Sequence, residues 1–236
     1  TLGKNPGFPG IAALNMERLY YVKTLIDEIG DFIKNVYMVD VAAVGALYAD
    51  WTTYGKGVTN YLCVPDMPLD TKGDTFELPG GYIPEGNISK FKPITSFNDD
   101  LFKQGVKESI KHSWYQGDWD RHPWEEETVP NHTEYARNGK YSWVKAPTFN
   151  GKPAQVGPLA NVLCMYAAGH KPTMTYATTV LDTVNSVLSL VGSKARVNIN
   201  SLHSTIGRIA GRSIRCAVLH DAVVSQWQAL IDNIGK

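Results

Sequence analysis

The positions of the prolines constrain the fold of this chain more than any other sequence feature. Ten of the thirteen prolines lie from Pro65 to Pro158, in a stretch that also contains many glycines. Proline lacks a backbone N–H and clashes with the preceding helical turn, so long helices are expected only outside this stretch. We therefore predict a mainly α fold, with a helical bundle formed by the N- and C-terminal segments. The long Pro/Gly-rich middle is expected to be dominated by loops, with a few short strands.

The sequence before this stretch has helical periodicity. Asn15 is a good N-cap, and the apolar residues after it recur at three- and four-residue steps, as on one buried face of a helix. Asp40 is a candidate N-cap for a second helix. The small residues in segment 41–49 predict that this second helix packs tightly in the interior. The periodic apolar residues are Met16, Leu19, Tyr20, Ile26, Ile29, Phe32, Ile33 and Val36.

The middle and the last third are expected to differ in regular structure. We predict one helix in the middle, near residues 97–112, and short strands around residues 76–83 and 154–157. Large aromatic side chains in the middle indicate an ordered segment, since disordered chains lack them. Helical periodicity then returns in residues 158–168, 173–190 and 201–234.

Charge and hydropathy exclude some classes of function. Lys and Arg total 23 and Asp and Glu total 23, so no net positive field favours nucleic acid or an anionic membrane surface. No apolar run reaches the roughly 18 residues that a membrane span needs, and no signal peptide is recognisable at the start. Charged residues make up only 19% of the chain, which favours a surface partly covered by a partner or by more polypeptide.

A histidine-rich and tryptophan-rich segment is the first candidate site. His112 and His122 are followed by the acidic run Glu125, Glu126 and Glu127, and such groups can bind zinc or a harder metal. The ten-residue spacing of the two histidines matches no metal motif. A structural aromatic cluster with Trp114, Trp119, Trp124 and Trp143 is the favoured interpretation, with a zinc site at His112 and His122 as a weaker alternative.

Three arginines form the second candidate site. Arg208, Arg212 and Arg215 follow one another at steps of four and three, which places them on one helical face. Such a stripe can bind a carboxylate, a phosphate or the acidic edge of a partner, or it can pair with acidic residues of the same fold. His203 and His220 are predicted to lie on the same helix, but 17 residues apart, too far to share one small site.

No residue type in this chain forms a recognisable catalytic pattern. The cysteines Cys63, Cys164 and Cys216 are odd in number and contain no C-x-x-C pair, so we predict buried thiols. The glycines at Gly80-Gly81 and Gly55-x-Gly57 do not form a phosphate-binding loop. No serine has the context of a nucleophile; those considered are Ser142, Ser201 and Ser204. The residues themselves therefore nominate no catalytic, cofactor-binding or metal-binding side chain.

Five short segments carry a resemblance to a known family. The tract KYSWVKAPTFNGKPAQVGPLA spans residues 140–160. The others are NMERL at 15–19, LPGG at 78–81, HSWY at 112–115 and STIGR at 204–208. Together they resemble the large subunit of the nickel-iron hydrogenases, closest to the uptake type. The resemblance covers roughly residues 15–236.

The resemblance implies an activity, a cofactor and a partner. Members of that family oxidise dihydrogen reversibly to protons and electrons. In the complete subunit, four cysteine thiolates hold a nickel-iron centre whose iron carries CN and CO ligands. The implied partner is a small subunit with iron-sulfur clusters, and the implied location is the periplasmic side of the inner membrane, with the cytoplasm as the alternative. No direct membrane span and no nucleic acid are expected.

This sequence also departs from the family pattern. None of its cysteines stands in the R-x-C-G-x-C or D-P-C-x-x-C context, so no metal ligand is carried over and no centre is expected in this segment alone. Gly7 replaces the histidine of the family's GGKNPH motif. We expect residues 1–236 to form one segment of a larger large-subunit domain, without its metal-binding N- and C-terminal parts. A non-catalytic structural or interaction fragment of that subunit is the alternative.

Overall fold

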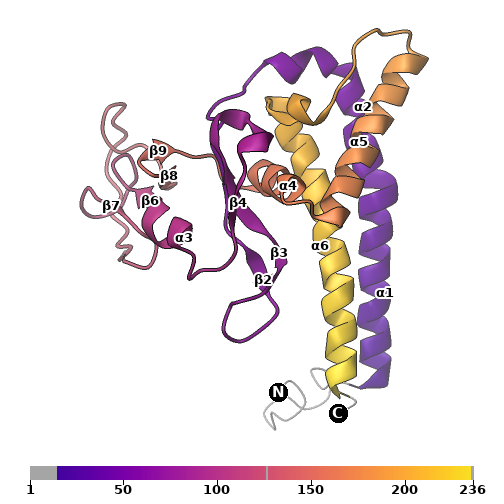
Figure 1. The fold of residues 1–236 in the computed structure, drawn as a ribbon, viewed down its shortest axis with the longest axis horizontal. Helices are drawn as coiled ribbons and strands as arrows, with labels where there is room; N and C mark the ends of the chain where they lie inside the picture. Colours follow the sequence, from indigo (N-terminus) through magenta and orange to yellow (C-terminus); the bar gives the residue numbers. More distant parts are fainter. Residues whose placement is uncertain (1–14, 126, 235–236) are drawn as a thin grey trace.

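The computed structural model describes residues 15–125 and 127–234. Long helices from both ends of this part of the chain lie side by side, and the short strands lie to one side of them (Figure 1). Gly7, which replaces the histidine of the family motif, and Glu126 of the acidic run lie outside the described residues. Within the described residues, no helix is both long and apolar enough to cross a membrane.

The first helical region is longer and more continuous than predicted. It consists of α1 (Met16–Phe32), a π-helical turn (Ile33–Tyr37), α2 (Met38–Leu47) and a 3-10 turn (Ala49–Thr53). The prediction for Asn15 is confirmed, because its side chain accepts a hydrogen bond from the Arg18 N–H at 2.9 Å. The prediction that Asp40 caps a second helix is wrong. The backbone stays helical through Phe32, Tyr37 and Met38, so no helix begins at Asp40 and no cap is needed there.

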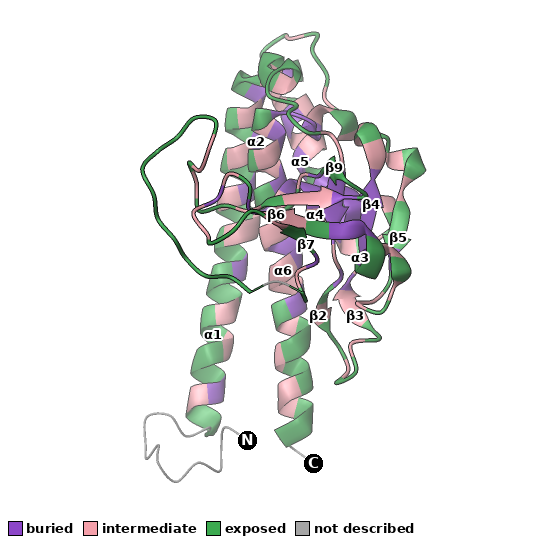
Figure 2. Ribbon diagram, turned by 90° about the vertical axis from the view of Figure 1, so that its left-hand side faces the viewer, coloured by how far each residue is buried: buried purple, intermediate pink, exposed green. Residues whose placement is uncertain are grey.

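The predicted buried face of α1 is mostly exposed. Leu19 is buried, and Ile26 and Ile33 are half-buried, whereas the other predicted positions face solvent. The reason is that α1 packs lengthwise mainly against α6, so only a narrow stripe is covered (Figure 2). The interior position predicted for α2 is correct on one side only: Ala42 and Ala46 are buried, while Val44 and Leu47 are exposed. The exposed positions are Met16, Tyr20, Ile29 and Phe32 of α1 and Val36 of the π-helical turn.

The three helices predicted in the last third are present. They are α4 (Pro158–Ala167), α5 (Lys171–Leu190) and α6 (Thr205–Ile234). Residues 199–202 form a separate 3-10 turn, Ile199–Leu202, so α6 begins after the predicted start. Proline lies at the first positions of α4 and α5, where its missing N–H costs nothing. The N-terminal and C-terminal helices meet as predicted, since α2 packs on both α5 and α6.

The middle contains more regular structure than predicted. Its described residues form nine short strands in three antiparallel sheets, ordered β1-β4-β5, β2-β3 and β7-β6-β8-β9. The strands are β1 (Tyr61–Cys63), β2 (Asp66–Pro68), β3 (Phe76–Leu78), β4 (Gly80–Ile83), β5 (Lys92–Ile94), β6 (Val106–Ser109), β7 (Asp120–Arg121), β8 (Ala146–Phe149) and β9 (Lys152–Pro153). Short 3-10 turns occur at Pro84–Gly86 and Ile88–Lys90.

The individual predictions for the middle have mixed outcomes. Strands predicted at residues 76–83 are confirmed as β3 and β4. The predicted strand at 154–157 is displaced: β9 lies just before it, and only Gln155 makes a bridge, to Tyr61. The helix predicted at 97–112 is wrong in length, because α3 spans only Asp100–Gly105. From Val106 onward the chain pairs with β8, and this pairing competes with continued helix.

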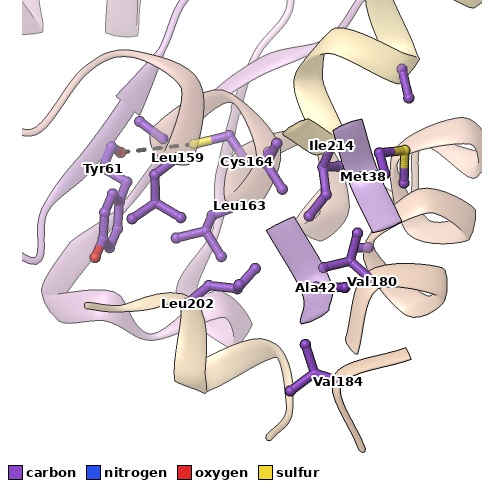
Figure 3. Packing of buried hydrophobic residues seen from close by; sticks show 14 of the residues in the cluster. Met38, Ala42, Tyr61, Leu159, Leu163, Cys164, Val180, Val184, Leu202 and Ile214 are labelled. Atoms are coloured by element: carbon purple, nitrogen blue, oxygen red, sulfur yellow. Dashed lines mark hydrogen bonds between the residues drawn. The ribbon is translucent and has the colours of Figure 1, made fainter. Parts of the chain in front are cut away.

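The main core joins the helices to the first sheet. Residues of α2, α4, α5 and α6 pack together with Tyr61, Cys63 and Ile83 of β1 and β4 (Figure 3). Small side chains at Ala42 and Ala177 let the helices approach closely. A second core lies between the sheets and α3, where the rings of Tyr82 and Phe149 stack at 4.1 Å. The start of α4 is thereby held against β1, and α6 packs on α4.

Candidate functional site

A cavity of about 410 Å³ lies where the start of α4 meets α6. Its polar lining comes from Gln155, Arg208 and Arg212, and its apolar lining includes Val58 and Leu159. The backbones of α4 and α6 approach closely here because residue 211 is glycine: a Cβ at Gly211 would lie 3.1 Å from Leu159 Cα. The cavity is therefore built from segments that are distant in sequence.

Arg208 holds one wall of this cavity in place. Its guanidinium donates hydrogen bonds to the backbone oxygens of Gly55 (2.5 Å) and Lys56 (3.1 Å), and to Gln155 Oε1 at 2.9 Å. Gly55 and Gly57 have φ values of +68° and +58°, a conformation that glycine adopts without strain. These two glycines thus shape a loop whose carbonyls face the arginine, and they do not form a phosphate-binding loop.

The three arginines of the predicted stripe have separate environments. Arg208 binds the 55–56 loop, and Arg215 forms an ion pair with Asp66 at 3.1 Å. Arg212 is exposed, and no hydrogen bond or ion pair of its side chain occurs within the described residues. The predicted pairing with acidic residues is thus confirmed for Arg215. Arg208 and Arg212 share the cavity.

A buried histidine–tyrosine pair lies near Arg208 and the loop at residues 55–56 that Arg208 binds. His203 Nδ1 and the Tyr61 hydroxyl are 2.8 Å apart, and both side chains are buried. Burial lowers the pKa of His203, and the positive charge of Lys56 lowers it further. Burial likewise raises the pKa of Tyr61, against the effect of Arg208. A neutral imidazole hydrogen-bonded to a neutral phenol is the result.

No sequence pattern indicates this pair. The two residues are 142 positions apart, and neither stands in a motif that signals the contact. His203 follows the 3-10 turn and precedes α6, so the prediction that it shares a helix with His220 is wrong. The prediction that the two histidines do not share a site is correct: His220 Nε2 contacts the Ile26 backbone oxygen at 2.9 Å, on α1.

The histidine and tryptophan segment forms aromatic contacts, as predicted. His112 stacks on Tyr141 at 5.1 Å between ring centres, and its Nδ1 is 2.7 Å from the Gly139 oxygen. His122 packs edge-on against Phe102 and Trp124. The rest of the segment follows the same pattern, with contacts among Trp114, Tyr115, His132 and Trp143, and with Trp119 beside Arg121 and Lys145.

The described residues contain no set of metal ligands. No group of three or more His, Cys, Asp or Glu side chains in residues 15–125 and 127–234 is placed to hold a metal ion. The prediction of buried thiols is confirmed for Cys63 and Cys164, whereas Cys216 is half-buried. Burial raises the pKa of Cys63 to about 11 and also raises that of Cys164, whose Sγ lies 3.9 Å from the Tyr61 carbonyl (Figure 3). Neither thiol belongs to such a group of three or more candidate ligands in the described residues.

The remaining glycines and serines have structural roles. A Cβ at Gly80 would lie 2.4 Å from Pro65 N, and one at Gly81 would lie 2.1 Å from Phe91 Cε2. The pair therefore allows close packing around β4. Ser204 Oγ accepts a hydrogen bond from the Gly207 N–H at 3.0 Å, which caps the start of α6.

Comparison with known proteins relates nearly the whole chain to one family. The model of the protein family described as nickel-dependent hydrogenase matches residues 7–236. The Hydrogenase-2 large chain of Escherichia coli (strain K12) is 45% identical over 229 residues, which cover 96% of this chain and 39% of that protein. The uptake hydrogenase large subunit of Cupriavidus necator is 33% identical, over 94% of this chain and 40% of that protein.

Solved structures show the same fold. The Ni-Fe-Se hydrogenase from Desulfovibrio vulgaris Hildenborough, in its as-isolated oxidized state, superposes with a TM-score of 0.65. The match covers 92% of this chain and 41% of that chain, at 24% sequence identity. This chain thus spans about two fifths of the length of these relatives. Because the family model matches nearly all of its residues, the chain belongs to the nickel-dependent hydrogenase family.

Proposed function

We propose that this chain is part of a nickel-iron hydrogenase large subunit, and that the assembled enzyme oxidises dihydrogen reversibly to protons and electrons. The family match over residues 7–236 carries this proposal. The relatives named as hydrogenase large chains support it, at 45% and 33% identity. The chain spans 39% of the Escherichia coli relative, so the activity is proposed for the complete enzyme.

The part played by this segment is structural in our proposal. Among its described residues, no group of three or more His, Cys, Asp or Glu side chains is placed to hold a metal ion. We assign no step of hydrogen chemistry to them. The segment instead supplies packed helices and sheets against which the remainder of a large subunit can be ordered. The CN and CO ligands of the iron are part of the proposal for the complete subunit only.

Partner and location complete the proposal. A small subunit carrying iron-sulfur clusters is the proposed partner, since a subunit that exchanges electrons with dihydrogen needs a path for those electrons. The similarity to uptake-type large subunits supports this partner. The proposed location is the periplasmic side of the inner membrane. Fractionation of cells tests it: recovery of the complex in the cytoplasm would contradict it.

Metal analysis combined with a hydrogen assay tests the function. The native complex containing the full subunit is purified from nickel-replete cells and, as a control, from nickel-depleted cells. We expect about one nickel and one iron atom at the active centre and hydrogen-dependent dye reduction in the first preparation only. A folded, metal-free complex without this activity in nickel-replete cells would instead support the non-catalytic structural fragment.

A further inference from the structure

We propose that the cavity between Arg208 and Arg212 is a binding site for a carboxylate group attached to a short apolar body. The side chains that form this site all belong to this chain, and binding there does not depend on hydrogen chemistry. A carboxylate ligand also gives a role to Arg212, which the family relationship leaves without one. Three properties of the cavity favour such a ligand: its free donors, its charge and its shape.

The Arg208 guanidinium is held in a fixed position and has N–H donors left for a ligand. Three of its hydrogen bonds go to neutral acceptors: the Gly55 and Lys56 oxygens and Gln155 Oε1. A guanidinium has five N–H donors, so about two remain for a ligand. None of these three acceptors neutralises the charge. The guanidinium is therefore held in place and keeps its full charge at the edge of the cavity.

Arg212 adds a second guanidinium one helical turn away. Residues four apart on a helix have Cβ atoms about 5–6 Å apart, so both side chains can reach one small anion. Arg212 is exposed and has no hydrogen bond or ion pair within the described residues. Its planar fork matches the two oxygens of a carboxylate. The third arginine of the stripe does not compete, because Arg215 pairs with Asp66.

The surroundings of the cavity are positive. None of its lining residues is Asp or Glu. Helix α4 begins at the cavity, and its N-cap residue Gly157 has no side chain to bind the first N–H groups. The partial positive charge of this first turn therefore adds to that of the arginines. Lys56 lies close enough to His203 to lower its pKa, and so contributes a further positive charge on the Arg208 side. An anion is the ligand that this field favours.

Shape and polarity favour an organic carboxylate over a phosphate. Five of the eight lining residues are apolar: Val58, Ala154, Val156, Pro158 and Leu159. The volume of about 410 Å³ far exceeds the roughly 10–15 Å³ that one water molecule needs by the same measure. An acetate-like or propionate-like group places its oxygens on the arginines and its carbon atoms on the apolar wall. A phosphate would leave several oxygens against that wall without donors.

Such a carboxylate has two sources: an Asp or Glu side chain of the assembled protein, or a free organic acid. The test uses the purified full-length complex and the variants Arg212→Gln, Arg212→Lys and Arg212→Glu. Arg137→Gln is the matched control, because Arg137 is also exposed but lies outside the cavity. Sodium acetate, sodium propionate and sodium phosphate are titrated by calorimetry at constant ionic strength, and thermal unfolding is recorded for each protein.

If the carboxylate belongs to a free organic acid, acetate and propionate should bind the unmodified complex, and Arg212→Gln should weaken binding about tenfold or more. Arg212→Lys should be intermediate, and Arg137→Gln unchanged. If the carboxylate is an Asp or Glu side chain of the assembled protein, acetate should not bind. The midpoint of thermal unfolding should then fall in Arg212→Gln and fall further in Arg212→Glu, while Arg137→Gln leaves it unchanged. The proposal is overturned if phosphate alone binds, if carboxylates bind equally to Arg212→Gln, or if neither binding nor the midpoint responds.

Discussion

At the scale of single residues, the environment of a side chain decides its chemistry in this molecule. His203 and His112 are both imidazoles with a hydrogen-bonded Nδ1. Burial beside Tyr61 and the charge of Lys56 lower the pKa of His203. The buried His203 Nε2 has no hydrogen-bond partner within the described residues. The neutral form is thus the one that the fold accommodates.

This environment predicts a pH dependence of stability. When the pH falls below about 6.5, the unfolded chain protonates its histidine first, while the folded chain resists protonation. The free energy of unfolding should therefore fall towards acid, by at most about 1.4 kcal/mol per pH unit for this one group. His203→Gln removes the titrating group, so its stability should depend less steeply on pH.

Urea unfolding between about pH 8 and about pH 5 measures this slope. The matched control is His132→Gln, since His132 is exposed. If His203→Gln and the unmodified protein had the same slope, His203 would not be held neutral by the fold.

At the scale of elements, α1 and α6 are joined by a glycine and a histidine. His220 Nε2 lies 2.9 Å from the Ile26 backbone oxygen, and its ring covers Gly30. A Cβ at Gly30 would lie 2.2 Å from two atoms of that ring. Residue 30 must therefore stay small for the two helices to remain at their distance. Gly45, on α2, differs because its Cβ would meet only Val184 Cγ2, at 3.8 Å.

The two glycines give opposite predictions. Gly30→Ala should destabilise the protein by about 1–3 kcal/mol, because the ring must move and the Ile26 contact is strained. Gly45→Ala should be neutral or stabilising by up to about 1 kcal/mol, because alanine favours helix and finds room. Urea unfolding of both variants checks this. Equal effects of the two substitutions would show that the Gly30 contact is not tight.

At the scale of the whole molecule, one carboxylate joins three helical segments. Asp221 on α6 accepts hydrogen bonds from Lys34 Nζ in the π turn (2.6 Å) and from the Tyr176 hydroxyl on α5 (2.8 Å). Lys34 also lies over the Tyr176 ring, 5.5 Å from its centre. Pairing with Asp221 and Tyr176 raises the pKa of Lys34 although burial acts in the opposite direction. The N- and C-terminal helices are thus connected by a polar network as well as by the core.

Removing this carboxylate should weaken the association of the three segments. Asp221→Asn is expected to lower the free energy of unfolding by about 1 kcal/mol, a modest value because both charged side chains are about one third exposed. The control is Asp27→Asn, which removes the more exposed Lys23–Asp27 pair within α1 and should cost less than about 0.5 kcal/mol. Chemical denaturation compares them. A larger effect of Asp27→Asn would contradict the role given to Asp221.

Much of the helical architecture could be predicted from local pattern. The cap at Asn15 and the helices α4, α5 and α6 follow from residues within one or two turns of each position. The same logic failed at Asp40, because a good capping residue has no effect where the helix does not begin. It also missed most strands in the middle of the chain other than β3 and β4, because each strand is short and forms only by pairing with another segment.

By itself, the sequence determined most of the long helices in the described residues and which family the chain belongs to. Only the tertiary structure decided that His203 meets Tyr61, that Arg208 and Arg212 line one cavity, and that most of the apolar face of α1 stays exposed. The physical reason is the range of the interactions. Helix periodicity and capping act between neighbours a few residues apart, whereas the cavity and the buried pair require segments up to 153 positions apart to meet.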